Sequence, residues 1–167
     1  MQVKTDDIKL LREKTGAGVM DCRRALVDAQ GNIDKAIGVL QECGWATAEK
    51  KATREASMGL VESYVHAGGK IGVLVEVNCE TDFVARTSEF QALAHDIAMQ
   101  ITAMNPKYIK AEDVPEEDKD RAQEYCLMLQ PFIKDPARTM ESLVKDTVAK
   151  VGENIQVKRF SRFELGK

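Results

Sequence analysis

The sequence lacks three features that would point to common functions: a block of basic residues, a long apolar run and a pair of closely spaced cysteines. Its 24 lysines and arginines are interleaved with 27 aspartates and glutamates. Phosphate binding needs a concentrated basic face, so we predict that nucleic acid is not a partner. No apolar run approaches the length of a membrane-spanning helix, and the polar, acidic residues after Met1 predict no secretory signal. We therefore expect a cytoplasmic protein with no membrane partner.

Metal-ligand clusters are also missing from the sequence. The four cysteines, Cys22, Cys43, Cys79 and Cys126, lie far apart, and neither of the two histidines is close to them in sequence. Zinc sites use cysteines and histidines at short, repeated spacings. We therefore predict no metal site, and we interpret the cysteines as buried, reduced thiols of a cytosolic protein.

What is present indicates a globular α+β protein. Of the 167 residues, 44% are hydrophobic and 31% are charged, which excludes a disordered chain. This length can form one domain or two small ones. No internal repeat or low-complexity segment is evident.

Residues 5–44 predict three short helices. Gly16 and Gly18 separate the first helix from the second, and Gly31 and Asn32 separate the second from the third, which we expect to end at Gly44. The second helix is predicted to carry these residues on its apolar face: Val19, Cys22, Ala25, Leu26 and Ala29. Such a minimal bundle has barely enough core to stand alone and usually binds a partner through an exposed face.

Val19 and Met20 are a candidate contact surface. Adjacent helical residues point about 100° apart, so the two side chains cannot both face the same core. A surface methionine beside a glycine-rich turn suits an adaptable contact. The alternative is that Met20 covers the edge of the bundle.

After a predicted linking helix over residues 46–58, the chain turns to strands. Residues 60–66 and 71–78 are rich in β-formers, and the turn between them contains two glycines, which predicts a hairpin. His66 lies beside this turn. A lone histidine is most often a surface or hydrogen-bonding residue, and we keep His66 only as a contact at an exposed rim.

The remainder predicts a small antiparallel sheet packed with helices. Ser88 and Gln91 are spaced as a capping box for a helix from Phe90 to Met104, which Asn105 and Pro106 end. A second helix is expected over residues 118–129 and a third over residues 140–151, with an irregular segment between them and Gly152 as the final terminator. Residues 155–164 predict a third strand with a bulge near Phe160.

The junction between the second strand and the first of these helices holds Phe83. The period of the apolar residues changes there from 2 to 3.6. A strand-to-helix junction has free backbone donors and a side chain that cannot be fully packed. Phe83 either folds back as a staple under the following helix or projects as a wedge into something else.

Three stretches in this order resemble bacterial elongation factor Ts. They are residues 11–26 (LREKTGAGVMDCRRAL), residues 76–86 (EVNCETDFVAR) and residues 151–155 (VGENI), the last followed by Arg159 and Phe160. The resemblance implies a ubiquitin-associated (UBA)-like three-helix domain over residues 1–45, a linker helix over 46–58 and an α+β core domain with a three-stranded antiparallel sheet over 59–167.

The resemblance also implies a function and its residues. Members of this family are guanine-nucleotide exchange factors for elongation factor Tu: they bind its GDP form, disturb the magnesium and phosphate site, release GDP and hold the empty state until GTP binds. Carried over by motif, Arg12, Val19 and Met20 dock on the nucleotide-binding domain of the partner. Asp82 and Phe83, with Thr81 and Val84 beside them, form the motif whose phenylalanine enters between partner helices near the magnesium.

His66 falls where the hairpin of the family approaches the phosphate loop of the partner. The activity breaks no covalent bond, so the resemblance implies no enzyme, no catalytic residue, and no cofactor or metal of the chain's own.

The chain departs from the family pattern in two ways. Many relatives carry a further helical stretch before the segment that begins at Gln130, and long relatives have a second core subdomain. Short relatives are dimers, and a three-stranded sheet needs its open face covered. We therefore expect a homodimer that packs its small sheets together.

Two other classes of function are compatible with parts of the sequence. A UBA-type adaptor that binds helices or nascent chains explains residues 5–44 but leaves the junction at Phe83 without a purpose. An enzyme would need Cys79 as nucleophile with His66 or His95 as base, and no second motif supports such catalysis.

Overall fold

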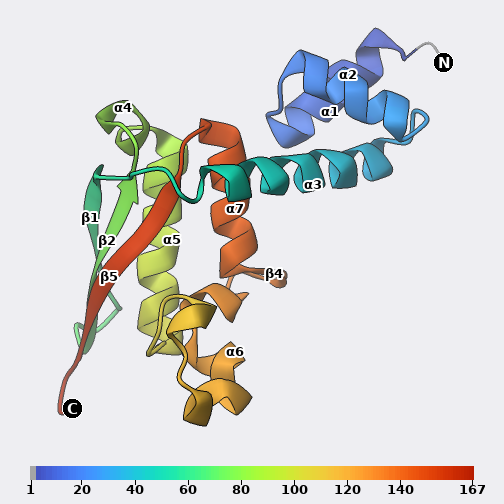
Figure 1. Cartoon of the computed structure of the whole chain (residues 1–167). Coiled ribbons are helices and arrows are strands. Elements are labelled where there is room, and N and C mark those ends of the chain that lie inside the picture. The colour runs from blue at the N-terminus through green and yellow to red at the C-terminus, as the bar shows by residue number, and fades with distance from the viewer. Residues whose placement is uncertain (1–2) are drawn as a thin grey trace.

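A computed structural model describes residues 3–167 of the chain as a group of N-terminal helices joined by one long helix to a helix-covered sheet (Figure 1). The helices are α1 (Thr5–Thr15), α2 (Val19–Asp28), α3 (Ile33–Lys51), α4 (Asp82–Ala85), α5 (Ser88–Met104), α6 (Ala122–Tyr125) and α7 (Met140–Val151). The strands are β1 (Met58–Val65), β2 (Ile71–Cys79), β3 (Pro131–Phe132), β4 (Asp135–Thr139) and β5 (Ile155–Glu164). Short 3₁₀ helices are η1 (Ala111–Asp113), η2 (Glu116–Arg121) and η3 (Leu127–Leu129).

The N-terminal helices, α1 to α3, confirm the three predicted helices and enclose a small core of their own. Its buried members are Leu11, Cys22, Ala25, Leu26, Ala29 and Ala36. Gly16 ends α1 with φ of 70°, a conformation that favours glycine. The side chain of Asn32 accepts from the backbone N–H of Lys35 and so caps α3.

The prediction that the third helix ends at Gly44 is wrong. α3 runs on to Lys51, so the segment predicted as a separate linking helix is the last part of α3 followed by a turn. Gly44 has another role, because a Cβ added there would lie 2.9 Å from the Cβ of Ala149 in α7. The glycine permits the close crossing of two helices.

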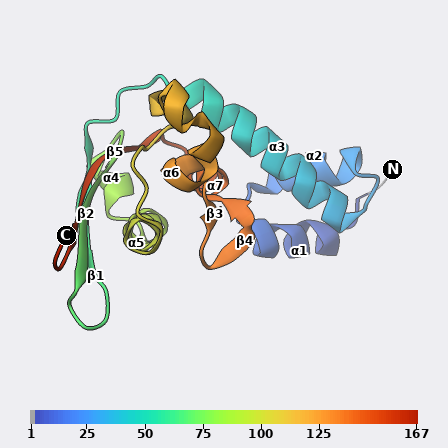
Figure 2. The same cartoon turned by 90° about the horizontal axis from the view of Figure 1, so that it is seen from below.

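Three polar contacts reinforce that crossing. Trp45 Nε1 donates to Asp146 at 2.7 Å, Lys145 pairs with Glu49 at 3.1 Å, and Lys51 Nζ donates to the carbonyl of Gly152 at 2.5 Å. Figure 2 shows α3 extending from the sheet-bearing part of the molecule along α7 to the other N-terminal helices.

The three-stranded antiparallel sheet has the order β1-β2-β5, which confirms the predicted hairpin and the added third strand. One face carries the buried side chains of Val73, Val75 and Val77 and is covered by α5. The irregularity expected near Phe160 lies slightly earlier. Arg159 pairs with Glu76 and Val157 pairs with Val77, so Lys158 is the extra residue.

α5 and α7 follow the predicted bounds closely. α5 ends at Asn105, which is left-handed with φ of 47°, and α7 ends at Gly152 with φ of 78°. The predicted capping box of Ser88 and Gln91 is wrong, and a single cap from Thr87 takes its place. The side chain of Thr87 accepts from the N–H of Phe90, and Ser88 is the first helical residue.

The segment between α5 and α7 differs most from prediction. The expected helix over residues 118–129 is divided into η2, α6 and η3, because Cys126 is extended and the N–H groups of Leu127 and Met128 donate to the carbonyls of Tyr108 and Ile109. The segment predicted to be irregular forms the short hairpin of β3 and β4.

Candidate functional site

Phe83 projects from the short helix α4 into solvent. Its side chain is 77% exposed, so the staple alternative is wrong. Phe83 follows the end of β2, and Figure 1 shows α4 at one end of the sheet, beside the start of α5.

The other residues of α4 fix it to the molecule. Val84 and Ala85 are buried in the main core, whereas Phe83 is exposed. The hydroxyl of Thr87 donates to the carbonyl of Val84 at 2.8 Å. Asp82, at the start of the helix, pairs with Arg86 at 2.8 Å on the surface. Val84, predicted as a partner contact, therefore supports Phe83 from beneath.

Thr81 precedes α4 and every polar group of it is bonded. Its N–H and Oγ1 donate to the two carboxylate oxygens of Glu153 at 2.9 and 2.7 Å, and Oγ1 also accepts from the N–H of Val84 at 3.4 Å. Its carbonyl accepts from the Cys79 thiol at 3.1 Å. Burial raises the pKa of that thiol, and the nearby Glu153 carboxylate raises it further.

Sequence reasoning missed three residues of this arrangement: Glu80, Glu153 and Asn154. Glu80 accepts from the N–H of Asn154 at 2.7 Å, on the loop that leads from α7 into β5. All three residues stand in the recognised motifs, which was the available signal. Their side chains bond across two loops that are far apart in sequence, so the periodicity of apolar residues could not predict the contacts.

Arg12, Val19 and Met20 form a second exposed group. Val19 is 51% exposed and Met20 is 64% exposed, so Val19 does not belong to the core face of α2 as predicted. Both lie at the first turn of α2, and Arg12 is exposed near the end of α1. Only the three residues of the turn containing Gly16 and Gly18 separate α1 from α2.

The structure does not bring the predicted contact residues into one place. His66 is exposed at the hairpin turn, and its N–H donates to the carbonyl of Ile71 at the far end of β2 from α4. Nine residues of strand separate the two ends, roughly 25 to 30 Å. In both Figure 1 and Figure 2, the start of α2 lies across the molecule from α4.

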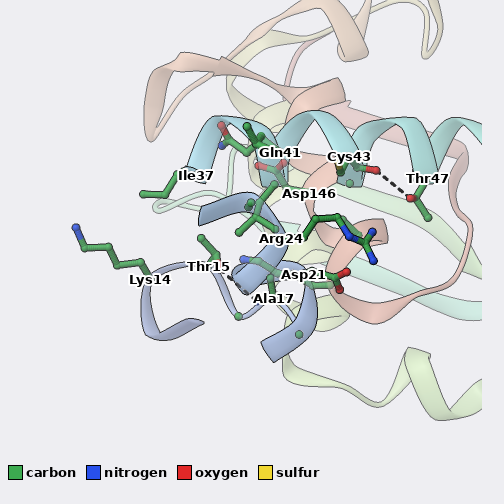
Figure 3. A pocket seen from close by; sticks show the side chains of 18 of the residues that line it. Lys14, Thr15, Ala17, Asp21, Arg24, Ile37, Gln41, Cys43, Thr47 and Asp146 are labelled. Atoms are coloured by element: carbon green, nitrogen blue, oxygen red, sulfur yellow. Dashed lines mark hydrogen bonds between the residues drawn. The ribbon is translucent and has the colours of Figure 1, made fainter. Parts of the chain in front are cut away.

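A cleft of about 610 Å³ lies between the N-terminal helices and α7 (Figure 3). Its lining carries charges of both signs, including Lys14, Asp21, Arg24 and Asp146. Asp146 is already bonded to Trp45 and to Arg138. We therefore interpret the cleft as a gap between α7 and the N-terminal helices, which are joined to the rest of the molecule through α3, and not as a ligand site.

The enzyme alternative has no support in the geometry. Cys79 is buried, and its thiol is bonded to Thr81. His95 is bonded to Glu62 at 3.3 Å, and no hydrogen bond within residues 3–167 joins Cys79 to either histidine. A nucleophilic cysteine needs a base within hydrogen-bond reach.

Residues 3–167 contain neither a metal-ligand cluster nor a helix that could span a membrane. No group of three or more histidines, cysteines or carboxylates is arranged to hold a metal ion. None of the helices described there is long and apolar enough to cross a membrane.

Comparisons with known proteins identify relatives along nearly the whole chain. The profile of the family described as "Elongation factor TS" matches residues 45–124. The "Elongation factor Ts" of Carboxydothermus hydrogenoformans is 49% identical, over 95% of this chain and 87% of the relative. That of Caldanaerobacter subterraneus is 49% identical, over 98% and 97% of the two chains, and that of Moorella thermoacetica is 48% identical, over 96% and 94%.

These alignments also indicate a difference in length. The alignment with the Carboxydothermus protein runs over 189 positions, more than the 167 residues of this chain. That relative therefore has residues with no counterpart here. This agrees with the expectation that relatives carry an additional stretch, and the position of that stretch stays a prediction.

Proposed function

Because the chain belongs to the elongation factor Ts family, we propose that it is a guanine-nucleotide exchange factor for elongation factor Tu in cytoplasmic translation elongation. The single observation that carries the proposal is the exposed phenylalanine of a buttressed one-turn helix. The activity needs no covalent chemistry, so we propose that the chain is not an enzyme and has no cofactor of its own.

The physical basis of such an activity is thermodynamic linkage. The factor binds the nucleotide-free partner more tightly than the GDP-bound partner, and by reciprocity GDP binds the complex more weakly by the same ratio. Each tenfold loosening of GDP requires about 1.4 kcal/mol of differential binding. Burying one aromatic side chain contributes about 1.5–3 kcal/mol. Phe83 can therefore supply a substantial share of the effect.

We propose that Phe83 enters between helices of the partner near its magnesium and so disturbs the magnesium and the phosphate loop. Asp82 lies beside it on the surface and contacts the same region. Thr81 and Val84 act from beneath, because the first is bonded to Glu153 and the second is buried. The empty partner is held until GTP binds.

We propose that Arg12, Val19 and Met20 dock on the nucleotide-binding domain of the partner. Two adjacent exposed apolar side chains and a cation at a helix junction suit such a surface. The N-terminal helices correspond in this proposal to a UBA-like domain over residues 1–45, with the linker over 46–58 and the core domain over 59–167. His66, at the distant hairpin turn, is proposed as a separate contact.

Release of labelled GDP from elongation factor Tu tests this function. The wild-type chain should accelerate release, and Phe83→Ala should lower the maximal rate by roughly 10- to 100-fold, the loss of one buried aromatic. Equal rates for the two proteins reject Phe83 as the wedge. No acceleration by either rejects exchange activity and favours an adaptor.

We also propose that the chain forms a homodimer through the open face of its sheet. Three cross-strand rows lie there: Val61–Glu76–Arg159, Ser63–Leu74–Ser161 and Val65–Gly72–Phe163. Val61, Val65, Leu74 and Phe163 are all exposed in the single chain. The hydrogen bond from Arg159, at 2.7 Å, lowers the pKa of Glu76, so the first of these rows contains an ion pair at neutral pH. Association of two such faces would cover the exposed apolar side chains of the other two rows, Leu74, Val65 and Phe163.

Light scattering at micromolar concentration tests the dimer. The mass should be twice the 18.6 kDa of one chain, and a monomer contradicts the proposal. The two exposed phenylalanines are matched controls. Phe163→Ala should lower the dimer fraction, because it removes the largest apolar group of the open face, whereas Phe83→Ala should leave the mass unchanged.

A further inference from the structure

Two glutamates on neighbouring loops each accept a hydrogen bond from the backbone of the opposite loop. Glu80, after β2, accepts from the N–H of Asn154, and Glu153, before β5, accepts from the N–H of Thr81. Each carboxylate therefore bonds the residue that follows the other glutamate. We call these four residues, Glu80, Thr81, Glu153 and Asn154, the clasp.

The clasp begins where the backbone pairing of the sheet ends. The ladder between β2 and β5 stops at Cys79 and Ile155. Beyond them, side-chain carboxylates replace carbonyls as acceptors, and bonds from a charged acceptor are stronger than neutral ones. The pairing of the two chain segments is thus extended to the residue from which α4 starts.

α4 needs such an anchor because it cannot hold its own shape. It has four residues, and a single helical turn fixes several dihedral angles for very few hydrogen bonds. Thr81 is its N-cap, and the same hydroxyl that caps it donates to Glu153. The direction in which Phe83 points is therefore set by where Glu153 holds Thr81.

The clasp also reaches the chain that leaves α3. The side chain of Asn154, which is 3% exposed, donates to the carbonyls of Ala52 and Arg54 at 3.4 and 2.7 Å. Arg54 in turn lies 3.6 Å from the carboxylate of Glu80. Three segments far apart in sequence thus meet at Glu80 and Thr81, immediately before α4.

We propose that Glu153 is a positioning residue for Phe83, an inference that rests on the exchange function proposed above. It holds Thr81, and through Thr81 the one-turn helix, so that Phe83 already points outward before the partner arrives. A side chain and backbone ordered in advance lose less entropy on binding. Glu153 acts on GDP release through Phe83 and makes no contact with the nucleotide.

Hydrogen exchange in the free chain tests the positioning without reference to any partner. Glu153→Ala should speed exchange of the backbone N–H groups of Val84, Ala85 and Arg86 by about tenfold or more, because the cap that orders them is released. The N–H groups of α5 should keep their wild-type rates. Unchanged rates in α4, or an equal rise in α5, overturn the inference, since the second result is merely global destabilisation.

A double-mutant cycle tests the effect on function. Glu153→Ala should lower the maximal rate of GDP release by about 5- to 10-fold, the loss of charge-assisted hydrogen bonds, with the half-saturating concentration unchanged. In the Phe83→Ala background it should have no further effect, because the side chain that it positions is gone. Glu153→Gln, which keeps one acceptor oxygen, should fall between wild type and Glu153→Ala.

Glu124→Ala is the matched control, because it removes from α6 a carboxylate that pairs with Arg121 of η2. It should behave as wild type in both measurements. Additive losses from Glu153→Ala and Phe83→Ala overturn the inference. If Phe83→Ala itself has no effect, the proposed role of Phe83 fails, and the exchange of the α4 N–H groups still decides whether Glu153 positions it.

Discussion

The N-terminal helices and the sheet-bearing part of the chain have hydrophobic cores of very different size. The first enclose six buried apolar residues, of which three are alanines. The second encloses nineteen, including Phe90, Ile97, Ile101 and Leu127. Because hydrophobic stabilisation scales with the apolar area buried, the N-terminal helices have much the smaller reserve of stability.

The two exposed surfaces differ in the same way. Val19 and Met20 stand on the first turn of α2, whose N-cap is Gly18 with no side-chain cap. Phe83 stands on a helix held by buried residues and by the clasp. The first surface can adapt to a partner, whereas the second presents one side chain in one direction. We infer that the first contributes mainly affinity and the second mainly exchange rate.

The largest expected effect separates affinity from rate. Replacing Val19 and Met20 together by alanine should raise the half-saturating concentration for GDP release by roughly 10- to 100-fold, because apolar area buried on binding is lost. The maximal rate should stay near wild type, in contrast to Phe83→Ala. Titration of GDP release against chain concentration measures both quantities.

Val27→Ala is the control for this prediction, because it removes another exposed apolar side chain from the last turn of α2. Its half-saturating concentration and its maximal rate of GDP release should both equal those of the wild type. A fall in the maximal rate with Val19 and Met20 replaced would remove the distinction between the two surfaces, and loss of helical signal would mean that these residues support the fold.

An intermediate effect concerns the joint between the two parts. Gly44→Ala should destabilise the chain by about 1–3 kcal/mol, because the new Cβ overlaps Ala149 and the two helices must separate. Gly38→Ala, in the same helix with nothing within 4 Å, should instead stabilise by about 0.5–1 kcal/mol. Chemical denaturation measures both changes.

The second half of this test is a rescue. Gly44→Ala should also weaken binding to the partner, because the separated helices displace the N-terminal contact residues. Adding Ala149→Gly restores the space between the helices, so binding should recover even though a glycine in α7 lowers stability. If Gly44→Ala and Gly38→Ala behave alike, the close crossing does not join the two parts.

The smallest effect concerns the order in which the cysteine thiols react with a reagent. Cys43 is exposed, so the prediction that all four cysteines are buried is wrong for this residue, and it should react at once with an aromatic disulfide reagent. Under mild denaturant, buried Cys22 of the N-terminal helices should react before Cys79 and Cys126, because the smaller core opens first. The raised pKa of Cys79 leaves less thiolate at a given pH and slows it further. Simultaneous reaction of all three would show that the two parts unfold as one.

Local patterns predicted the elements whose own residues determine them. The hairpin followed from alternation and two turn glycines, and α7 from its apolar spacing and Gly152. The errors came where distant contacts decide. Gly44 was predicted to end the third helix because its contact with Ala149, about a hundred residues later, cannot be seen in the local sequence. Cys126 leaves helical geometry because the residues after it bond to residues 108–109. The clasp could not be predicted for the same reason.

The unbroken course of α3 through Gly44 has a consequence for how the chain can change in length. The helix has 19 residues and spans about 28 Å. One residue inserted between Gly38 and Gly44 would lengthen it by only about 1.5 Å, yet would turn the N-terminal helices by about 100° around its axis. Val19 and Met20 would then face away from their present direction, although every local contact on either side was kept. The length of α3 therefore sets the rotational orientation of the N-terminal helices as well as their distance from the sheet.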